Sequence, residues 1–149
     1  VQIEAAWLTR FAAKIGLSTP TAEDTDLIQE LLDLMQKDGT DFTNTFRALA
    51  TDTARDQFTD REAFDQWSVK HKTRITSEQD ANATMNAANP AVIPRNHRIE
   101  QMIQAATAGD MAPFHRLMKA YATPYTLTDT DLAAPPTQAE IVPATFCGT

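Results

Sequence analysis

The stretch that decides the fold class is DTDLIQELLDLMQKDG, residues 24–39. Its apolar residues recur at helical spacing and make one wide face: Leu27, Ile28, Leu31, Leu32, Leu34 and Met35. Glu23 and Asp24 suit the positive end of a helix dipole, and the helix is expected to end at Gly39. The stretch therefore predicts an amphipathic helix with one buried face.

The same spacing recurs on both sides of this stretch. Further helices are expected over Ile3–Ile15, Phe42–Leu49, Phe64–Ile75, Ile99–Ala106 and Phe114–Tyr121. Gly16 is expected to cap the first of them and Asp41 to begin the second. Thr59-Asp60-Arg61-Glu62 reads as a capping box with Thr59 as the cap. His71 follows the apolar row of its helix, and we interpret it as a core-edge histidine rather than a ligand.

Proline interrupts the helical pattern in two places. Asn89-Pro90 and Ile93-Pro94 predict a break, because proline disfavours helix at the residue before it. Beyond Thr123, Pro124, Pro135, Pro136 and Pro143 leave no room for a long helix. We therefore expect an all-α fold, an irregular bundle of six or seven helices. Residues 1–122 form its helical region, and residues 123–149 form an extended tail over its surface.

The net charge of −7 is unevenly distributed. Residues 23–65 carry a local charge of −8, and residues 66–78 carry +2. An acidic surface repels phosphate backbones, so we expect no nucleic acid partner there. The simplest interpretation is a solvated helical surface, since most charged runs are that. A binding face for a basic protein is the alternative.

Length, hydropathy and cysteine content set further limits. No run approaches the roughly 20 apolar residues of a membrane span, and no basic leader precedes an apolar stretch. We therefore expect no membrane partner and a cytoplasmic location. The chain of 149 residues begins at Val1, which is typical of a piece of a longer protein. Cys147 is the only cysteine, so neither an internal disulfide nor a cysteine-based zinc site can form within this chain.

The residues do not assemble any familiar catalytic pattern. The four glycines stand singly at 16, 39, 109 and 148, so no glycine-rich phosphate loop is present. His71, His97 and His115 lack metal-ligand spacing. The compact polar cluster 95–98, Arg-Asn-His-Arg, has two interpretations. It could hold a phosphate or carboxylate, or it could begin a helix, with Asn96 as the cap and Arg95 paired with an acid.

Several segments of the sequence are similar to motifs of one protein family. Asp41-Phe42-Thr43 followed by Phe46-Arg47-Ala48-Leu49 is similar to one family segment. Residues 85–97, MNAANPAVIPRNH, resemble the family signature and contain Asn86, Asn89, Pro90, Pro94, Arg95 and Asn96. The ending Thr145-Phe146-Cys147-Gly148-Thr149 is similar to the terminus of bacterial members. These segments resemble the selenoprotein O family, and the similarity runs through nearly the whole chain in family order.

This resemblance implies a function for the parent protein. Selenoprotein O-like proteins are kinase-like pseudokinases that act as nucleotidyltransferases. With ATP and magnesium they transfer AMP to Ser, Thr or Tyr hydroxyls of proteins. Their nucleotide-binding, metal-binding and catalytic residues lie upstream of the segments matched here. The resemblance therefore implies no catalytic, cofactor-binding or metal-binding residue in this chain, and it leaves the signature residues a structural role. It also implies a redox role for Cys147.

Two hypotheses follow for the chain. In the first, it is the scaffolding and redox-regulatory C-terminal end of a protein adenylyltransferase, and its partners are the upstream kinase-like domain and the parent enzyme's protein substrates. In the second, it is an independent helical interaction module that uses its acidic face. If the chain is an excised piece, its exposed apolar surface should give a weak homodimer.

Overall fold

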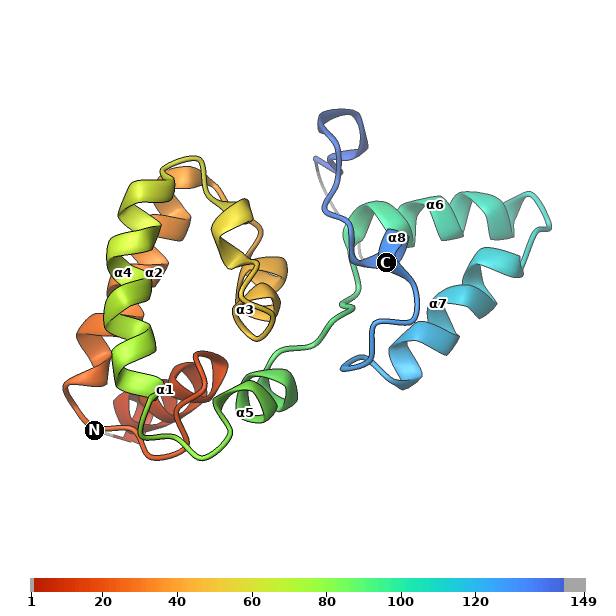
Figure 1. The fold of residues 1–149 in the computed structure, drawn as a ribbon. Helices are drawn as coiled ribbons and strands as arrows, with labels where there is room; N and C mark the ends of the chain where they lie inside the picture. The colour runs from red at the N-terminus through yellow and green to blue at the C-terminus, as the bar shows by residue number, and fades with distance from the viewer. Residues whose placement is uncertain (1, 144–149) are drawn as a thin grey trace. The chain divides into compact units, whose positions relative to one another are not determined.

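The computed structural model describes residues 2–143, which form helices and connecting segments with no strand among them (Figure 1). The predicted all-α fold is confirmed. The described residues contain eight α-helices, and seven of these are longer than the four-residue α8 (Thr130–Ala133). Contacts divide the chain into two compact units, Val1–Pro90 and Ala91–Thr149. The predicted boundary after residue 122 came from composition and stays a prediction.

The first unit contains six helical elements. These are α1 (Gln2–Lys14), α2 (Asp24–Asp38), α3 (Phe42–Leu49), the 3-10 helix η1 (Ala54–Gln57), α4 (Arg61–Ile75) and α5 (Ala81–Ala88). Helices α2 and α4 lie side by side (Figure 1). Helix α1 packs against α5 and α2, and α3 packs against η1 and α5. The predicted stripe of α2 faces inward, since Ile28, Leu31 and Met35 are buried.

Aromatic side chains fill the core of the first unit. Trp67 is 2% exposed, and its indole N–H donates to the carbonyl oxygen of Leu27 at 2.8 Å. Its ring lies 5.6 Å from that of Phe64 and stacks on that of His71 at 4.8 Å. His71 is 4% exposed, which agrees with its interpretation as a core-edge histidine. Because this hydrogen bond satisfies the indole N–H, the Trp67 ring is buried without the free-energy cost of an unpaired donor.

Two glycines end helices in the left-handed conformation, as predicted for Gly16, and Gly39 stands at the predicted end of its helix. Gly39 has φ +66° after α2, and Gly16 has φ +90° after α1. A side chain at Gly16 would also collide with the neighbouring helix, because its Cβ would lie 3.0 Å from the Cβ of Ala81. Gly16 therefore permits both the turn and the close approach of α1 to α5.

Aspartates cap the next two helices. The Asp41 side chain accepts a hydrogen bond from the amide of Asn44 at 2.8 Å, as predicted. The predicted Thr59 cap is wrong, because α4 begins one residue later. Asp60 is the cap, and it accepts from the amide of Ala63 at 3.1 Å. The amide of Asp60 donates to the Asp38 carboxylate at 2.8 Å, and this contact with α2 fixes where α4 begins.

The second unit is built around a helical hairpin. It contains α6 (Asn96–Thr107), α7 (Ala112–Ala122), α8 and the 3-10 helix η2 (Gln138–Glu140). Helices α6 and α7 pack against each other (Figure 1). Its core consists of smaller side chains: Ala91, Val92, Leu117, Ala120 and Leu132. The described part of the predicted tail holds no long helix, only α8 and η2.

Arginines join the hairpin to the segment that follows it. Arg116 of α7 pairs with Asp129 at 2.6 Å and with Asp131 at 2.9 Å. Arg98 of α6 pairs with Asp131 at 2.6 Å and lies 3.9 Å from Glu140. These charge-assisted contacts hold the residues after Thr123 against α6 and α7.

Among residues 2–143, no helix combines the length and apolar character that a membrane crossing requires.

Candidate functional site

Asn89, a residue of the family-like signature, lies at the end of α5. It is 1% exposed. Its Nδ2 donates to the carbonyl oxygens of Lys14 at 2.8 Å and Phe46 at 3.3 Å. Its Oδ1 accepts from the Lys14 ammonium at 3.2 Å. One buried amide thus joins the ends of α1, α3 and α5, and its hydrogen-bonding groups are used inside the unit.

Two cations complete this junction. Arg47 of α3 donates from Nη1 to the carbonyl oxygens of Asn86 at 3.1 Å and Asn89 at 2.9 Å. The Lys14 ammonium lies 5.6 Å from the ring centroid of Phe46, within cation–π range. Burial lowers the pKa of Lys14. Both cations are therefore directed at the unpaired carbonyl end of α5 or at rings of the core.

The signature continues into the second unit, where its residues differ in exposure. Pro94 and Asn96 are exposed, and Arg95 is buried. The amides of Ala91 and Val92 both donate to the carbonyl oxygen of Pro124, at 2.8 and 3.1 Å. The signature therefore spans the point where the chain passes from one unit to the other, and its polar groups serve main-chain contacts on both sides.

The predicted start of α6 needs a correction. Asn96 is the first helical residue rather than the cap, and Arg95 occupies the cap position without a side-chain cap hydrogen bond. The reason is the chain direction after Pro94: Arg95 is extended, at φ −101° and ψ 131°, as a cap residue must be, so the helix begins only after it. Arg98, in the first turn of α6, pairs with Asp131 at 2.6 Å, and the acid partner expected for Arg95 stays a prediction.

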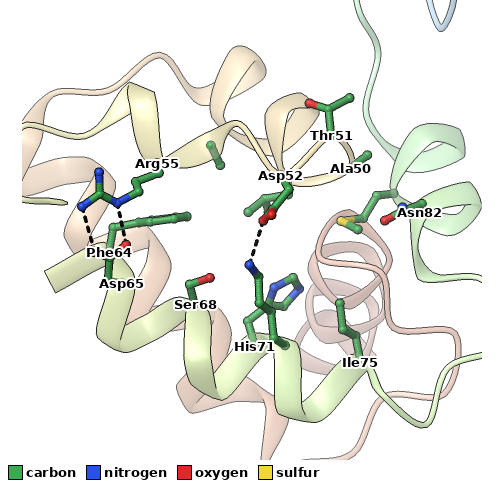
Figure 2. A pocket seen from close by; sticks show the side chains of 14 residues that line it. Ala50, Thr51, Asp52, Arg55, Phe64, Asp65, Ser68, His71, Ile75 and Asn82 are labelled. Atoms are coloured by element: carbon green, nitrogen blue, oxygen red, sulfur yellow. Dashed lines mark hydrogen bonds and ion pairs between the residues drawn. The ribbon is translucent and has the colours of Figure 1, made fainter. Parts of the chain in front are cut away.

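A hollow of about 470 Å³ opens in the first unit (Figure 2). It lies between the segment that joins α3 to η1, one face of α4, and α5. Asp52 lies on the joining segment and Arg55 lies in η1, and each pairs with a residue of α4. Asp52 contacts Lys72 at 2.9 Å, and Arg55 makes two hydrogen bonds to Asp65, at 2.8 and 2.9 Å. Asp52 has φ +56°, a left-handed conformation that aspartate tolerates.

His71 forms part of the wall of this hollow. Its Nε2 lies 2.7 Å from the carbonyl oxygen of Ile15. A carbonyl oxygen only accepts hydrogen bonds, so Nε2 carries the proton and Nδ1 is the bare nitrogen. Burial lowers the pKa of His71, although the Ile15 carbonyl opposes that shift. The ring is therefore neutral near pH 7, and the positive charges at the hollow belong to Arg55 and Lys72.

The acidic stretch and the basic stretch of the sequence meet in this unit. Three ion pairs join them: Asp24 with Arg74 at 2.7 Å, Glu30 with Lys70 at 2.8 Å, and Asp52 with Lys72 at 2.9 Å. The first is the most buried, since the Asp24 side chain is 4% exposed. Three of the twelve carboxylates of residues 23–65 are therefore paired with the basic stretch, two of them between α2 and α4, while the net charge of residues 23–78 stays at −6.

The three histidines singled out in the sequence do not form a common metal site among the described residues. His97 and His115 belong to the second unit and His71 to the first. Within residues 2–143, no three or more histidine, cysteine, aspartate or glutamate side chains are grouped closely enough to hold a metal ion. Cys147 lies outside the described residues, so its redox role stays a prediction.

Comparison with known proteins extends the resemblance seen in the signature. A family model described as "Protein adenylyltransferase SelO" matches residues 2–122. The chain belongs to the SelO family. The protein nucleotidyltransferase YdiU of Roseobacter denitrificans is 59% identical over 148 residues, and that of Ruegeria pomeroyi is 54% identical over 149 residues. The YdiU protein of Agrobacterium fabrum is 41% identical over 156 residues.

These alignments cover nearly all of this chain but only part of each relative. They include 99% of this chain for the first two relatives and 96% for the third, but only 32% of each relative. The chain thus spans about a third of the length of the SelO-family relatives it matches. The predicted family resemblance is confirmed.

Sequence reasoning missed the junction at Asn89 and the hollow at Asp52. The Asn89 side chain bonds main-chain carbonyl groups 75 and 43 residues away. Every residue has a main-chain carbonyl group, so the amino-acid sequence does not indicate which of them would be a partner. One sequence signal for the hollow existed. Asp65, Ser68 and Lys72 follow one another at helical spacing, opposite the charged residues of the 50–55 segment.

Proposed function

We propose that this chain is the helical C-terminal part of a SelO-family protein adenylyltransferase. In the whole protein it stabilises the enzyme and carries a redox-active tail, and it does not supply catalytic groups. The parent transfers AMP from ATP to Ser, Thr or Tyr hydroxyls of proteins, with loss of pyrophosphate. This assignment of roles rests on the family membership and on the third of each relative that the chain spans.

The junction at Asn89 is the observation that best supports a structural role. The amide of this signature residue is 1% exposed and bonds Lys14 and the carbonyl of Phe46. Arg47, the arginine of the other family-like segment, bonds the carbonyls of Asn86 and Asn89. Groups committed to main-chain contacts inside a unit are not available to bind ATP or a protein substrate.

The chemistry of AMP transfer defines what the rest of the protein must provide. The α-phosphate must be held in line with the acceptor hydroxyl, and cations must offset the developing charge. Magnesium, bound with ATP, would supply part of that charge. The family resemblance assigns these groups to the segment upstream of the one matched here. In this proposal the kinase-like domain of the same polypeptide is the first partner of the chain.

Exposed apolar side chains in the second unit support a packing role. Ile103 is 48% exposed, Met111 45% and Met118 54%. Side chains of this kind on the hairpin would lie against the rest of the enzyme in the whole protein. The same surface would give the isolated chain a weak homodimer, which the whole protein would lack.

Cys147 is proposed to act as the redox residue of the tail. With an external low-molecular-weight disulfide as the oxidant, two successive thiol–disulfide exchanges would join the terminal thiol to another thiol of the enzyme, and the external disulfide would leave as two thiols. The new disulfide would link the tail to the remainder of the enzyme. Oxidation would then change AMP transfer by the whole protein. A Cys147→Ser variant should remove that dependence on a thiol reductant while leaving the activity of the reduced protein unchanged.

The independent interaction module remains the second candidate. It needs an unpaired acidic face over residues 23–65. Three of its carboxylates, however, pair with Lys70, Lys72 and Arg74 of α4. Because these pairs reduce the field that would attract a basic partner, the charge pattern favours the first proposal.

Calorimetry can test whether ATP binding and AMP transfer belong to the full-length protein and not to this chain. This chain and the full-length protein would each be titrated with ATP and magnesium, and AMP transfer to protein would be followed with labelled ATP. We expect binding and transfer with the full-length protein only. Micromolar ATP binding by this chain, or AMP transfer catalysed by it, would contradict a non-catalytic role.

A further inference from the structure

The hollow beside Asp52 is separate from the junction at Asn89. We propose that it binds a zwitterionic small molecule of the α-amino-acid class that carries a large apolar side chain. Its volume of about 470 Å³ is within the range of roughly 300–1,000 Å³ typical of small-molecule sites.

Part of the lining of the hollow is apolar. Leu49 and Ile75 line it and are half-buried, so they offer apolar surface to a ligand, whereas Ala54, Phe64 and Met85 also line it but are at most 5% exposed. His71, beside them, is neutral for the reasons given above. An apolar side chain placed here would leave water without burying a charge, and this is the favourable contribution that a large side chain provides.

The rim presents two ion pairs of opposite polarity (Figure 2). Asp52, on the segment between α3 and η1, is negative, and Arg55, in η1, is positive. Their partners on α4, Lys72 and Asp65, have the reverse order. The rim is therefore neutral in sum. A simple anion would meet the carboxylates and a simple cation would meet the basic groups, whereas a zwitterion can place each of its charges beside an opposite one.

Both rim pairs are exposed enough to exchange partners. The Asp52 and Lys72 side chains are 78% and 58% exposed, and those of Asp65 and Arg55 are 49% and 46% exposed. Exposed pairs of this kind contribute little to stability, so opening them costs little. A ligand carboxylate can bind Lys72 or Arg55, and a ligand ammonium can bind Asp52 or Asp65, while any displaced side chain stays in contact with water.

Two further polar side chains are available at the hollow. The hydroxyl of Ser68 points into it, and Asn82 stands at its α5 side (Figure 2). Neither side chain has a hydrogen-bond partner among residues 2–143. A hydroxyl and an amide can serve an ammonium as acceptors and a carboxylate as donors, so they fit either orientation of a zwitterion.

The first test compares ligands with the full-length protein by isothermal titration calorimetry. The probes are L-phenylalanine, 3-phenylpropionate with only the carboxylate, 2-phenylethylamine with only the ammonium, and glycine with no side chain. We expect L-phenylalanine to bind about tenfold or more tightly than each of the others, since each lacks one group of contacts. Equal binding of a single-charge analogue, or no binding of L-phenylalanine at millimolar concentration, would overturn the proposal.

The second test locates the site with matched variants. Lys70 and Lys72 are both on α4, both exposed, and both paired with a carboxylate, but only Lys72 lines the hollow. Lys72→Gln should weaken L-phenylalanine binding about tenfold, and Lys70→Gln should leave it unchanged. Asp65→Asn should weaken it as well. Equal effects of the two lysine variants would place the ligand elsewhere and refute the assignment.

Discussion

The two units of this chain bury very different side chains. The first encloses Phe46 and Trp67, at 1% and 2% exposure, together with a buried asparagine that has hydrogen-bond partners. The second buries Val92 and Leu117 among alanines and leaves Met118 54% exposed. A core of large rings gains more from burial than a core of small side chains. The first unit therefore has the stronger interior of its own, and the second has more to gain from a partner.

The largest expected effect comes from removing the central ring of the first unit. Trp67→Ala should lower the free energy of unfolding by about 3–5 kcal/mol, because it leaves a cavity and an unpaired carbonyl at Leu27. Urea denaturation followed by circular dichroism measures this loss. Val69→Ala is the control on the same helix. Val69 is 68% exposed, so its change should stay within about 0.5 kcal/mol. Comparable losses for both variants would mean that α4 does not bury the face described here.

The junction at Asn89 tests whether polar contacts add to the first unit's advantage. Asn89→Ala should cost about 1–3 kcal/mol, since it strands buried carbonyl groups of α1 and α3. Asn82→Ala, an exposed asparagine on the same helix, is the matched control and should be near neutral. Chemical denaturation of both variants gives the comparison. A neutral Asn89→Ala would show that water replaces the amide and that the junction is not essential.

The ion pair of Asp24 and Arg74 predicts a pH dependence. Burial works to raise the pKa of Asp24, but hydrogen bonds from Arg74 and Thr21 outweigh it, and the pKa is lowered. The pair therefore contributes fully above the ordinary carboxyl range, near pH 4, and its contribution is lost as pH falls below that.

The variant Asp24→Asn should cost about 1–2 kcal/mol at neutral pH, because Arg74 can still bond Glu78 and the carbonyl of Thr19. It should also flatten the loss of stability on acidification from about pH 5 downward. Unfolding free energies measured across this range give the slope. An unchanged slope in the variant would assign the acid sensitivity to other carboxyls.

The smallest expected effect belongs to the second unit. Hydrogen bonds from the Thr137 amide, the Thr137 hydroxyl and Gln101 lower the pKa of Glu140 to about 2. Carbon-detected NMR of the side-chain carboxyl should show this midpoint. Thr137→Ala should move it upward, whereas Thr137→Ser keeps the hydroxyl and should hold it near 2. A midpoint at the ordinary glutamate value in the unmodified chain would show that η2 does not stay in place.

Local signals in the sequence predicted most of the helices. The stripe Ile28–Leu31–Met35, the helix end at Gly39 and the cap Asp41 are confirmed, because these depend on neighbours within one or two turns. The cap predicted at Thr59 is wrong, since a contact from Asp38 on another helix decides between two adjacent candidates. Local propensity alone could not weigh that contact.

The sites were harder to predict than the helices. The signature around Asn89 was found from its resemblance to a family, but the residues gave no indication of what its amide bonds. The pairing of the acidic stretch, residues 23–65, with the basic stretch, residues 66–78, was also missed, because it depends on contacts between residues far apart in the sequence. Asp24 and Arg74 are 50 residues apart, and only the packing of α2 on α4 brings them together.

The division of the chain into two units has a practical consequence for spectroscopy. Both tryptophans, Trp7 and Trp67, belong to the first unit, and both tyrosines, Tyr121 and Tyr125, belong to the second. Light absorbed only by indole therefore reports on one unit, and phenol emission reports on the other. A single unlabelled sample can thus show whether the two parts melt together or in turn.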